Sequence, residues 1–464
     1  MKKIHVVFHD GGGGHRNAAI ALQTIAAQQG RDWEVDLVQF QDLTDRLDVL
    51  RKLTGIRIQQ QYNIMLQNGW TLGSAQLLKV LQLTIRIFHG PMVRLLEEYW
   101  REHPADLLVS VIPHFNREIS ESWSAVYSGR PFVTLITDLA DYPPRFWIEP
   151  IKEQYVIAGT EKAVEQARSF GHDEAHIFQA SGMILRPDFY VEENVDRLAL
   201  REEMGLQPGL TTAIVLFGGH GSKVMYDITE RLDAAGLPLQ LILICGRNEA
   251  LAAKLRGQKW KMPVHVVGFT KEVHKLMRAA DFLIGKPGPG SIAEAMVRKL
   301  PVLIECNSWT LPQERYNAEW VTEKRVGIVL NKFGGVVDGV RQMLEPARLA
   351  EFRKNVAALD NRAIFEIPEM LAALLGEQVT LLVVEIDCHR RDRSSKRRRM
   401  PERALRPMLK TVPPGQNQFV MQSFPEKSAW RSASRAISRA SRSGIDGRAN
   451  PQPSRCHCRY PARY

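Results

Sequence analysis

Hydrophobic residues in this chain come in short, nearly continuous runs of Val, Ile and Leu, separated by longer stretches with helical spacing. Six runs in the first 180 residues predict strands, and six more follow after residue 210. Continuous apolar runs are typical of parallel strands that are buried on both faces. The pattern therefore predicts two doubly wound α/β domains in tandem. The predicted strands are Ile4–Phe8, Val35–Phe40, Leu107–Ile112, Phe132–Thr137, Tyr155–Ala158, Ile177–Ala180, Thr212–Phe217, Leu239–Cys245, Val264–Val267, Phe282–Ile284, Val302–Glu305 and Gly327–Leu330.

The domain boundaries follow from the same alternation. A chain of 464 residues exceeds what one hydrophobic core usually organises. We expect one domain over 1–185 and a second over 186–377, whose last helix can cross back to the first domain. The join falls in Met183–Phe189. Ligands of such folds bind beyond the carboxyl ends of the strands, so we expect the site between the two domains.

The positive charge of the chain belongs to its last segment. The formal net charge is +11, but residues 378–464 hold 19 Lys+Arg against 6 Asp+Glu, and residues 1–377 hold 43 against 45. The segment shows no sustained period of 2 or 3.6, which predicts a disordered basic tail. A frameshifted end of the reading frame has the same composition. A tail that binds nucleic acid or anionic lipid is the alternative.

The ends and the cysteines exclude several classes of protein. No apolar run approaches the roughly 18 residues that a spanning helix needs. The N-terminal run turns polar at His9-Asp10, before a signal-peptide core could form. Five scattered cysteines indicate neither a disulfide framework nor a convincing zinc site. We therefore expect a cytoplasmic protein whose first residues form a buried strand.

Glycine-rich loops follow three of the predicted strands. The first, Gly11–Gly14, leads to His15 at the start of a helix, and it matches neither the dinucleotide fingerprint nor the P-loop. Gly13 and Gly14 still allow a ligand to approach the backbone, and His15 is a candidate for the site, with a structural histidine cap as the alternative. The second loop, Phe217–Lys223, and the third, Gly285–Ser291, take the same place in the second domain.

The second and third loops together predict a nucleotide-diphosphate pocket. Backbone N–H groups at a helix start bind phosphate readily. Glu294 lies about one turn into the helix after the third loop, where its carboxylate can accept two ribose hydroxyls. A single glycine loop is more often a turn than a site, but two loops with a carboxylate at this offset are typical of such a pocket.

These loops, with Leu311–Glu314 and Asn317, resemble glycosyltransferase family 28, and most of all the bacterial and plant monogalactosyldiacylglycerol synthases. A more distant similarity is to the peptidoglycan GlcNAc-transferase. The resemblance covers about residues 3–375. It implies a GT-B fold, a UDP-sugar donor bound mainly by the C-terminal domain, and inverting transfer that needs no metal or other cofactor.

The resemblance also implies roles for individual residues. Gln313 and Glu314 would face the sugar hydroxyls, and the backbone at Gly268 and Phe269 would read uracil. His15 and the pair Thr137-Asp138 match motifs of the N-terminal domain. This sequence differs from the family pattern at Pro289, at Arg315-Tyr316 and at Met183-Ile184. Ser222 and Gly288 would belong to the donor site. The diphosphate would be held by Gly218, Gly219, Gly221, Gly290 and Ser291.

Inverting transfer requires a base for the acceptor hydroxyl and a positive field for the departing diphosphate. The helix starts at Gly221-Ser222 and Gly290-Ser291 could supply this field without a metal. His15 is the favoured base, because imidazole titrates near neutral pH. Asp138 is the competing candidate, with a loop or N-cap carboxylate as its structural alternative.

The acceptor prediction depends on residues 51–96, which contain six Lys/Arg and no Asp or Glu among many apolar residues. Such a basic amphipathic stretch is typical of an anionic membrane surface, although Leu77, Leu81 and Ile85 at helical spacing could also be core. No nucleic-acid-binding motif occurs here, and we expect no nucleic-acid partner. The residues expected to face the membrane are Arg57, Tyr62, Trp70 and Arg86.

The sequence thus predicts a hexosyltransferase, peripherally bound to the inner face of the cell membrane, that moves sugar from a UDP-sugar to a lipid hydroxyl, with diacylglycerol as the favoured acceptor. One alternative is a UDP-GlcNAc transferase that acts on a polyprenyl-linked or lipopolysaccharide precursor. Others are a UDP-sugar epimerase and a non-enzymatic protein that binds nucleotides or nucleic acid through its basic tail.

Overall fold

The computed structural model describes residues 1–10, 13–44, 82–191, 196–377, 380–383 and 408–411. The chain divides into two compact units, Met1–Glu377 and Gln378–Tyr464. In the second unit, β13 (Thr380–Val383) pairs antiparallel with β14 (Met408–Thr411). The rest of the predicted basic tail lies outside the described residues.

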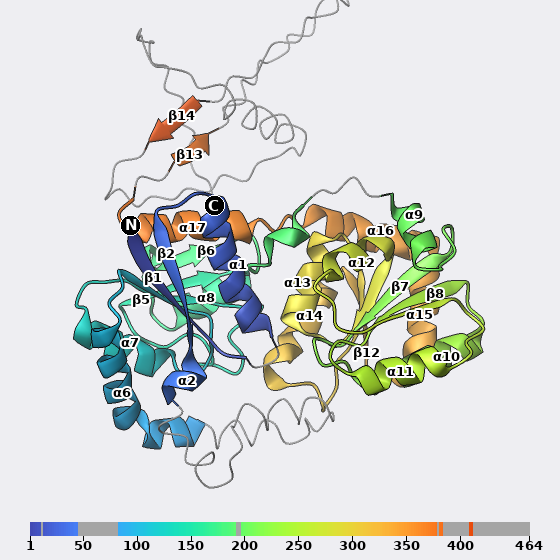
Figure 1. Cartoon of the computed structure of the whole chain (residues 1–464), viewed down its shortest axis with the longest axis horizontal. Helices are drawn as coiled ribbons and strands as arrows, with labels where there is room; N and C mark the ends of the chain where they lie inside the picture. Colours follow the sequence, from blue (N-terminus) through green and yellow to red (C-terminus); the bar gives the residue numbers. More distant parts are fainter. Residues whose placement is uncertain (11–12, 45–81, 192–195, 378–379, 384–407, 412–464) are drawn as a thin grey trace, which may run out of the picture. The chain divides into compact units, whose positions relative to one another are not determined.

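The first sheet has six parallel strands in the order β2-β1-β3-β4-β5-β6 (Figure 1). Because Val, Ile and Leu occupy both faces of its central strands, side chains on both sides are buried, as in all four residues of β3. The strands are β1 (Lys2–Phe8), β2 (Trp33–Gln39), β3 (Leu107–Ser110), β4 (Phe132–Leu135), β5 (Gln154–Ala158) and β6 (Ile177–Gln179).

The second sheet is also parallel and six-stranded, in the order β12-β11-β10-β7-β8-β9. Each of the twelve predicted strands is present, so the predicted pair of doubly wound α/β domains is confirmed. The strands are β7 (Thr211–Leu216), β8 (Leu239–Ile244), β9 (Val264–Val267), β10 (Phe282–Gly285), β11 (Val302–Glu305) and β12 (Gly327–Leu330).

Helices connect the strands and cover the faces of the sheets (Figure 1). They are α1 (Gly14–Gln28), α2 (Phe40–Thr44), α6 (His89–Glu102), α7 (Asn116–Val126), α8 (Glu161–Ser169), α9 (Arg197–Glu203), α10 (Val224–Ala235), α11 (Glu249–Gly257), α12 (Val273–Ala279), α13 (Pro289–Val297), α14 (Arg315–Glu323), α15 (Val336–Leu344), α16 (Pro346–Ala358) and α17 (Ala363–Leu374).

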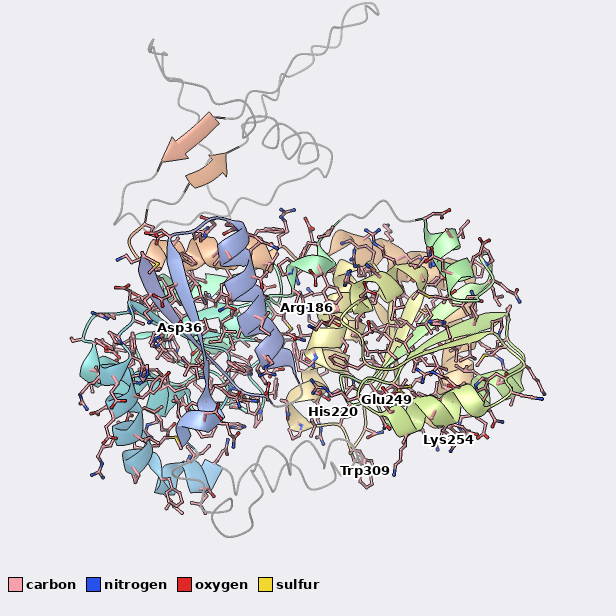
Figure 2. All side chains as sticks on the ribbon, viewed as in Figure 1. Asp36, Arg186, His220, Glu249, Lys254 and Trp309 are labelled. Atoms are coloured by element: carbon pink, nitrogen blue, oxygen red, sulfur yellow. The ribbon has the colours of Figure 1, made fainter. Side chains whose placement is uncertain are left out.

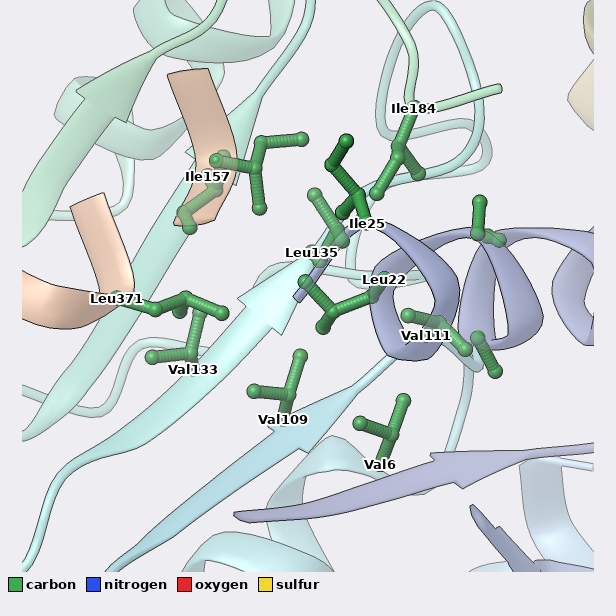
Figure 3. Close-up of a cluster of buried hydrophobic side chains, with 14 of the residues drawn as sticks. Val6, Leu22, Ile25, Val109, Val111, Val133, Leu135, Ile157, Ile184 and Leu371 are labelled. Atoms are coloured by element: carbon green, nitrogen blue, oxygen red, sulfur yellow. The ribbon is translucent and has the colours of Figure 1, made fainter. Parts of the chain in front are cut away.

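The last helix of the first unit packs against the first sheet. α17 contacts α1, and its Ile364, Ile367 and Leu371 belong to the same buried cluster as the strands of that sheet. Figure 3 shows Leu371 beside Val133 and Ile157. Arg362, just before α17, donates its backbone N–H to Ser181 Oγ at 2.6 Å. The end of the chain's first unit therefore stabilises the domain in which the chain begins.

Candidate active site

The first glycine loop directs His15 toward the carboxyl ends of the first sheet. Helix α1 begins at Gly14, and its N-cap residue Gly13 has φ 85°, a left-handed conformation that glycine adopts without strain. His15 Nδ1 lies 2.8 Å from the carbonyl oxygen of Val111, which follows β3. A carbonyl only accepts, so Nδ1 carries the proton and Nε2 is the basic nitrogen. Burial lowers the pKa of His15 to about 4 and keeps it neutral at pH 7.

Asp138 and His15 belong to one cluster of side chains. Thr137 Oγ1 is 3.1 Å from His15 Nδ1, and Trp147 Nε1 donates a 2.8 Å hydrogen bond to Asp138 Oδ2. The rings of His15 and Trp147 are 5.7 Å apart. Burial raises the pKa of the Asp138 carboxyl to about 7, against the opposing effect of the Trp147 hydrogen bond. Two candidate bases therefore meet at this edge of the sheet.

Two further histidines lie at the same edge, and the sequence analysis did not single them out. The rings of His9 and His15 are 4.2 Å apart. Burial lowers the pKa of both His9 and His114, and the charge of His15 lowers it further. His114 has φ 71°, and its backbone N–H bonds the carbonyl of Phe146 at 2.6 Å. Their places after β1 and β3 could have indicated this grouping, because the exits of parallel strands meet at one edge of the sheet.

The second glycine loop forms a tight turn before its helix. Gly218 and Gly221 have φ of 75° and 61°, and the N–H of Gly221 bonds the carbonyl of Gly218 at 3.3 Å. Helix α10 begins only at Val224, so the expected helix start at Gly221-Ser222 is wrong. The left-handed residue at Gly221 delays the helix, because a left-handed residue cannot propagate it. Gly219 is exposed, and Ser222 Oγ accepts a 3.4 Å hydrogen bond from the N–H of Val224.

Replacement of Gly221 by alanine is expected to destabilise the fold by about 1–3 kcal/mol. A Cβ at this position would lie 2.4 Å from the carbonyl oxygen of Cys245, and φ is left-handed. Gly219→Ala is the matched control, because a Cβ there meets no atom within 4 Å. Urea unfolding of both variants measures the difference. Equal free energies of unfolding for the two variants would contradict the left-handed conformation of Gly221.

The third glycine loop leads directly into α13. Gly288 is the N-cap and Pro289 occupies the first helical position, where its missing N–H costs nothing. This explains how the chain accommodates proline where the family pattern differs. Gly290 and Ser291 follow in the first turn, so their expected place at a helix N-terminus is confirmed. Asn317 Nδ2 donates to the carbonyl of Pro287 at 2.7 Å and holds the loop against α14.

Glu294 lies one turn further along α13 and is partly exposed. Burial raises the pKa of its carboxyl to about 7, and the charge of Arg186 acts in the opposite direction. Arg186 (labelled in Figure 2) lies in the segment that joins the two sheets, and its guanidinium donates to the carbonyl of Lys271 at 2.9 Å. The arginine was not predicted, since nothing in the local sequence pairs it with Glu294.

The predicted uracil and sugar contacts lie at the ends of β9 and β11. Gly268 follows β9, and the exposed ring of Phe269 lies 5.0 Å from the guanidinium of Arg247. Gln313 and Glu314 form a short 3-10 helix, Pro312–Glu314, before α14. Glu314 is buried, and its Oε1 accepts a 2.6 Å hydrogen bond from Lys286 Nζ.

A small apolar cluster connects the strand exits of the two sheets. Leu139 and Ala140, just after Asp138, pack with Ala293 beside Glu294 and with Tyr316 of α14. The ring of Tyr316 is stacked on that of Tyr142 at 6.0 Å. Tyr316, which replaces a smaller residue of the family pattern, is thus buried in this cluster. The charges of Glu314 and Lys286 also act on the pKa of Asp138, the first raising and the second lowering it. The candidate base Asp138 therefore lies close to the third glycine loop and to Glu314.

The structure describes one of the four residues expected to face a membrane. Arg57, Tyr62 and Trp70 lie outside the described residues. Arg86 is exposed in a helical segment at 82–87, whereas Ile85 of the same segment is buried. Leu83 is 58% exposed and Ile87 67% exposed. Leu83, Arg86 and Ile87 share one face of the segment, because residues three and four apart are neighbours on a helix.

Two features are absent from the residues that the structure describes. Within these ranges, no three His, Cys, Asp or Glu side chains are grouped so that they could hold a metal ion. None of the helices described is long and apolar enough to cross a membrane.

The two parallel six-stranded sheets, with glycine loops at their strand exits, define a GT-B fold. Solved structures share it. Acinetobacter baumannii MurG matches with a TM-score of 0.50 and 14% identity, over 80% of this chain and 99% of that one. S. aureus MnaA in complex with UDP matches with a TM-score of 0.51 and 14% identity, over 81% of this chain and 97% of that one. At these identities the likeness concerns the fold alone, and the predicted GT-B fold is confirmed.

Residues 213–351 match the model of the glycosyltransferase family 28 C-terminal domain. The chain therefore carries the C-terminal domain of glycosyltransferase family 28, as the loops predicted. Monogalactosyldiacylglycerol synthase 1 of Arabidopsis thaliana is 28% identical over 342 residues, which is 70% of this chain and 62% of that protein. The monogalactosyldiacylglycerol synthase of Spinacia oleracea is 28% identical over 366 residues, which is 74% of this chain and 66% of that protein. The matched part spans less than two thirds of each plant protein.

Proposed function

We propose that this protein is an inverting glycosyltransferase that moves a hexosyl group from a UDP-sugar to a lipid hydroxyl, most favourably that of diacylglycerol. The observation that carries the proposal is the meeting of the His15–Asp138 cluster with the third glycine loop and its helix in a family 28 domain. The similarity to plant monogalactosyldiacylglycerol synthases supports a lipid acceptor.

The donor would bind to the second domain. Backbone N–H groups of the loops at Gly218–Ser222 and Gly288–Ser291 would hold the diphosphate, and the first turn of α13 adds the positive end of its helix dipole. Glu294 would accept the ribose hydroxyls, and the backbone at Gly268 would meet uracil. Gln313 and Glu314 would contact the sugar.

His15 would take the proton of the acceptor hydroxyl at Nε2, because Nδ1 is bound to Val111. Its low pKa of about 4, a result of burial, makes it a weak base. The anionic donor would raise this pKa, since a nearby negative charge favours imidazolium. Asp138, whose pKa of about 7 is suited to proton transfer at neutral pH, is the second candidate.

The function is tested by UDP release from the full-length chain, offered UDP-galactose, UDP-glucose and UDP-GlcNAc in turn. Each donor is assayed with anionic vesicles that contain or lack diacylglycerol. Release that depends on diacylglycerol and occurs with one donor is the expected result. UDP release that does not depend on diacylglycerol would indicate hydrolysis of the donor and would contradict the proposal.

We propose that the protein docks peripherally on the cytoplasmic face of an anionic membrane through the face that carries Leu83, Arg86 and Ile87. Replacing Leu83 and Ile87 together by glutamine is expected to weaken binding to phosphatidylglycerol vesicles about tenfold or more, because two half-exposed apolar side chains no longer enter the interface. Vesicle sedimentation measures the effect.

Leu198→Gln is the matched control for this experiment. Leu198 is 48% exposed, like Leu83, but lies in α9 of the second domain. Its replacement is expected to leave vesicle binding unchanged. Equal binding of the double variant and the unmodified protein would exclude this face as the docking surface.

A further inference from the structure

Lys286 lies at the start of the third glycine loop, directly after β10. Its ammonium group donates a hydrogen bond to Glu314 Oε1 at 2.6 Å. The lysine side chain is 36% exposed, whereas that of Glu314 is 10% exposed. A ligand can therefore reach the lysine, while the carboxylate holds it from the inner side.

The lysine side chain runs between the two loops that would hold the diphosphate. A Cβ placed on Gly288 would lie 3.3 Å from Cε of Lys286, and one placed on Gly218 would lie 4.0 Å from the same atom. The Cβ built on Gly288 would also lie 3.8 Å from Glu314 Oε1. Glycine at both positions thus leaves room beside the ammonium group, at the point where the loops converge.

The pair also lies in electrostatic reach of the candidate base cluster, because both of its charges act on Asp138. A cation at this position would therefore lie beside the donor loops and near the anomeric carbon of the bound donor. Backbone N–H groups and a helix dipole supply only partial charges, so they do not neutralise a diphosphate that gains negative charge as it leaves.

We propose that Lys286 is the cation that binds the donor diphosphate and stabilises it as leaving group, and that Glu314 holds the ammonium in place until the donor arrives. The inference rests on the proposed function. In the transfer, the acceptor oxygen forms a bond to the anomeric carbon. The bond from that carbon to the β-phosphate oxygen breaks and leaves its electron pair on UDP, while the acceptor proton goes to the base. Lys286 keeps its proton and donates hydrogen bonds throughout.

When the donor enters, the lysine would turn from Glu314 to the phosphate oxygens, and Glu314 would be released to the sugar hydroxyls. The two residues are therefore expected to act on different parts of the donor. Lys286 would affect UDP and UDP-sugar alike, whereas Glu314 would affect only the UDP-sugar.

The test is calorimetry on the full-length chain with uridine, UDP and the UDP-sugar. Lys286→Met is expected to weaken UDP binding about 10- to 100-fold, since a hydrogen bond to a charged group is lost, and to leave uridine affinity within about twofold. Lys286→Arg is expected to restore most of the UDP affinity. Glu314→Gln is expected to keep UDP affinity and to weaken binding of the UDP-sugar.

Lys254→Met is the matched control. Lys254 (labelled in Figure 2) lies on α11 of the same domain, with its ammonium 3.6 Å from the ring centre of Tyr226. Its loss is expected to change neither affinity. An equal loss of uridine and UDP affinity in Lys286→Met would mean that the lysine only supports the loop and would overturn the inference, as would unchanged UDP affinity. If the unmodified chain bound neither uridine nor UDP, the proposed function itself would fail, and the inference with it.

Discussion

Replacement of His15 by alanine is expected to lower kcat about 10²- to 10⁴-fold, the usual contribution of a positioned general base, and to leave the affinity for UDP within about twofold. His15 lies in the first domain, and its ring contacts Val111, Thr137 and the neighbouring aromatic rings. The diphosphate and ribose would contact the second domain. Steady-state kinetics with diacylglycerol vesicles, together with calorimetry for UDP, separate the two effects.

The control for His15 is the competing base. Asp138→Asn is expected to cost far less than His15→Ala, because asparagine keeps an oxygen to accept the hydrogen bond of Trp147 Nε1. A larger loss in Asp138→Asn would exchange the roles of the two residues. A parallel loss of kcat and UDP affinity in His15→Ala would instead mean that His15 positions the donor.

Glu294→Ala is expected to weaken UDP binding about 100-fold or more, because a carboxylate that accepts two ribose hydroxyls is lost. The ligand 2′,3′-dideoxy-UDP supplies the control. This ligand lacks both ribose hydroxyls, so its affinity for the unmodified protein is expected to equal the affinity of UDP for Glu294→Ala. Its affinity for the unmodified protein and for the variant is expected to be the same. A further loss of affinity for the dideoxy ligand in the variant would show that Glu294 does not bind the ribose.

The pH dependence of UDP binding gives a second check on Glu294. Burial raises the pKa of this carboxyl to about 7. Only the ionised form can accept both hydroxyls, so UDP affinity is expected to fall as the pH drops from 8 to 6. Glu294→Gln does not titrate, and its affinity is expected to keep only the pH dependence of the ligand. Identical profiles for the two proteins would contradict the assignment.

Much of the donor site could be predicted because it is local. Strand, glycine loop and helix are consecutive in the chain, and Glu294 lies at a fixed helical offset from Gly288. The expected start of the helix after the second loop was less accurate. Whether the helix begins at Ser222 or Val224 depends on the backbone conformation of Gly221, which packs against the carbonyl of Cys245. That contact comes from a different strand exit and leaves no local pattern.

Contacts between distant segments could not be predicted. Lys286 and Glu314 are 28 residues apart, and no local pattern in the sequence connects them. Likewise, the coupling of Arg186 with Glu294 depends on how the joining segment passes α13. The grouping of His9 and His114 with His15 required the order of the strands in the sheet.

The sequence alone determined the two parallel sheets, their twelve strands, the three glycine loops and the family 28 character of the second domain. These properties depend on hydrophobic period and on short consecutive motifs, which are written in neighbouring residues. Only the tertiary structure decided the tautomer of His15, the raised pKa of Asp138 and the pairing of Lys286 with Glu314. The physical reason is that burial and hydrogen-bond partners come from segments far apart in the chain, and a local pattern carries no information about them.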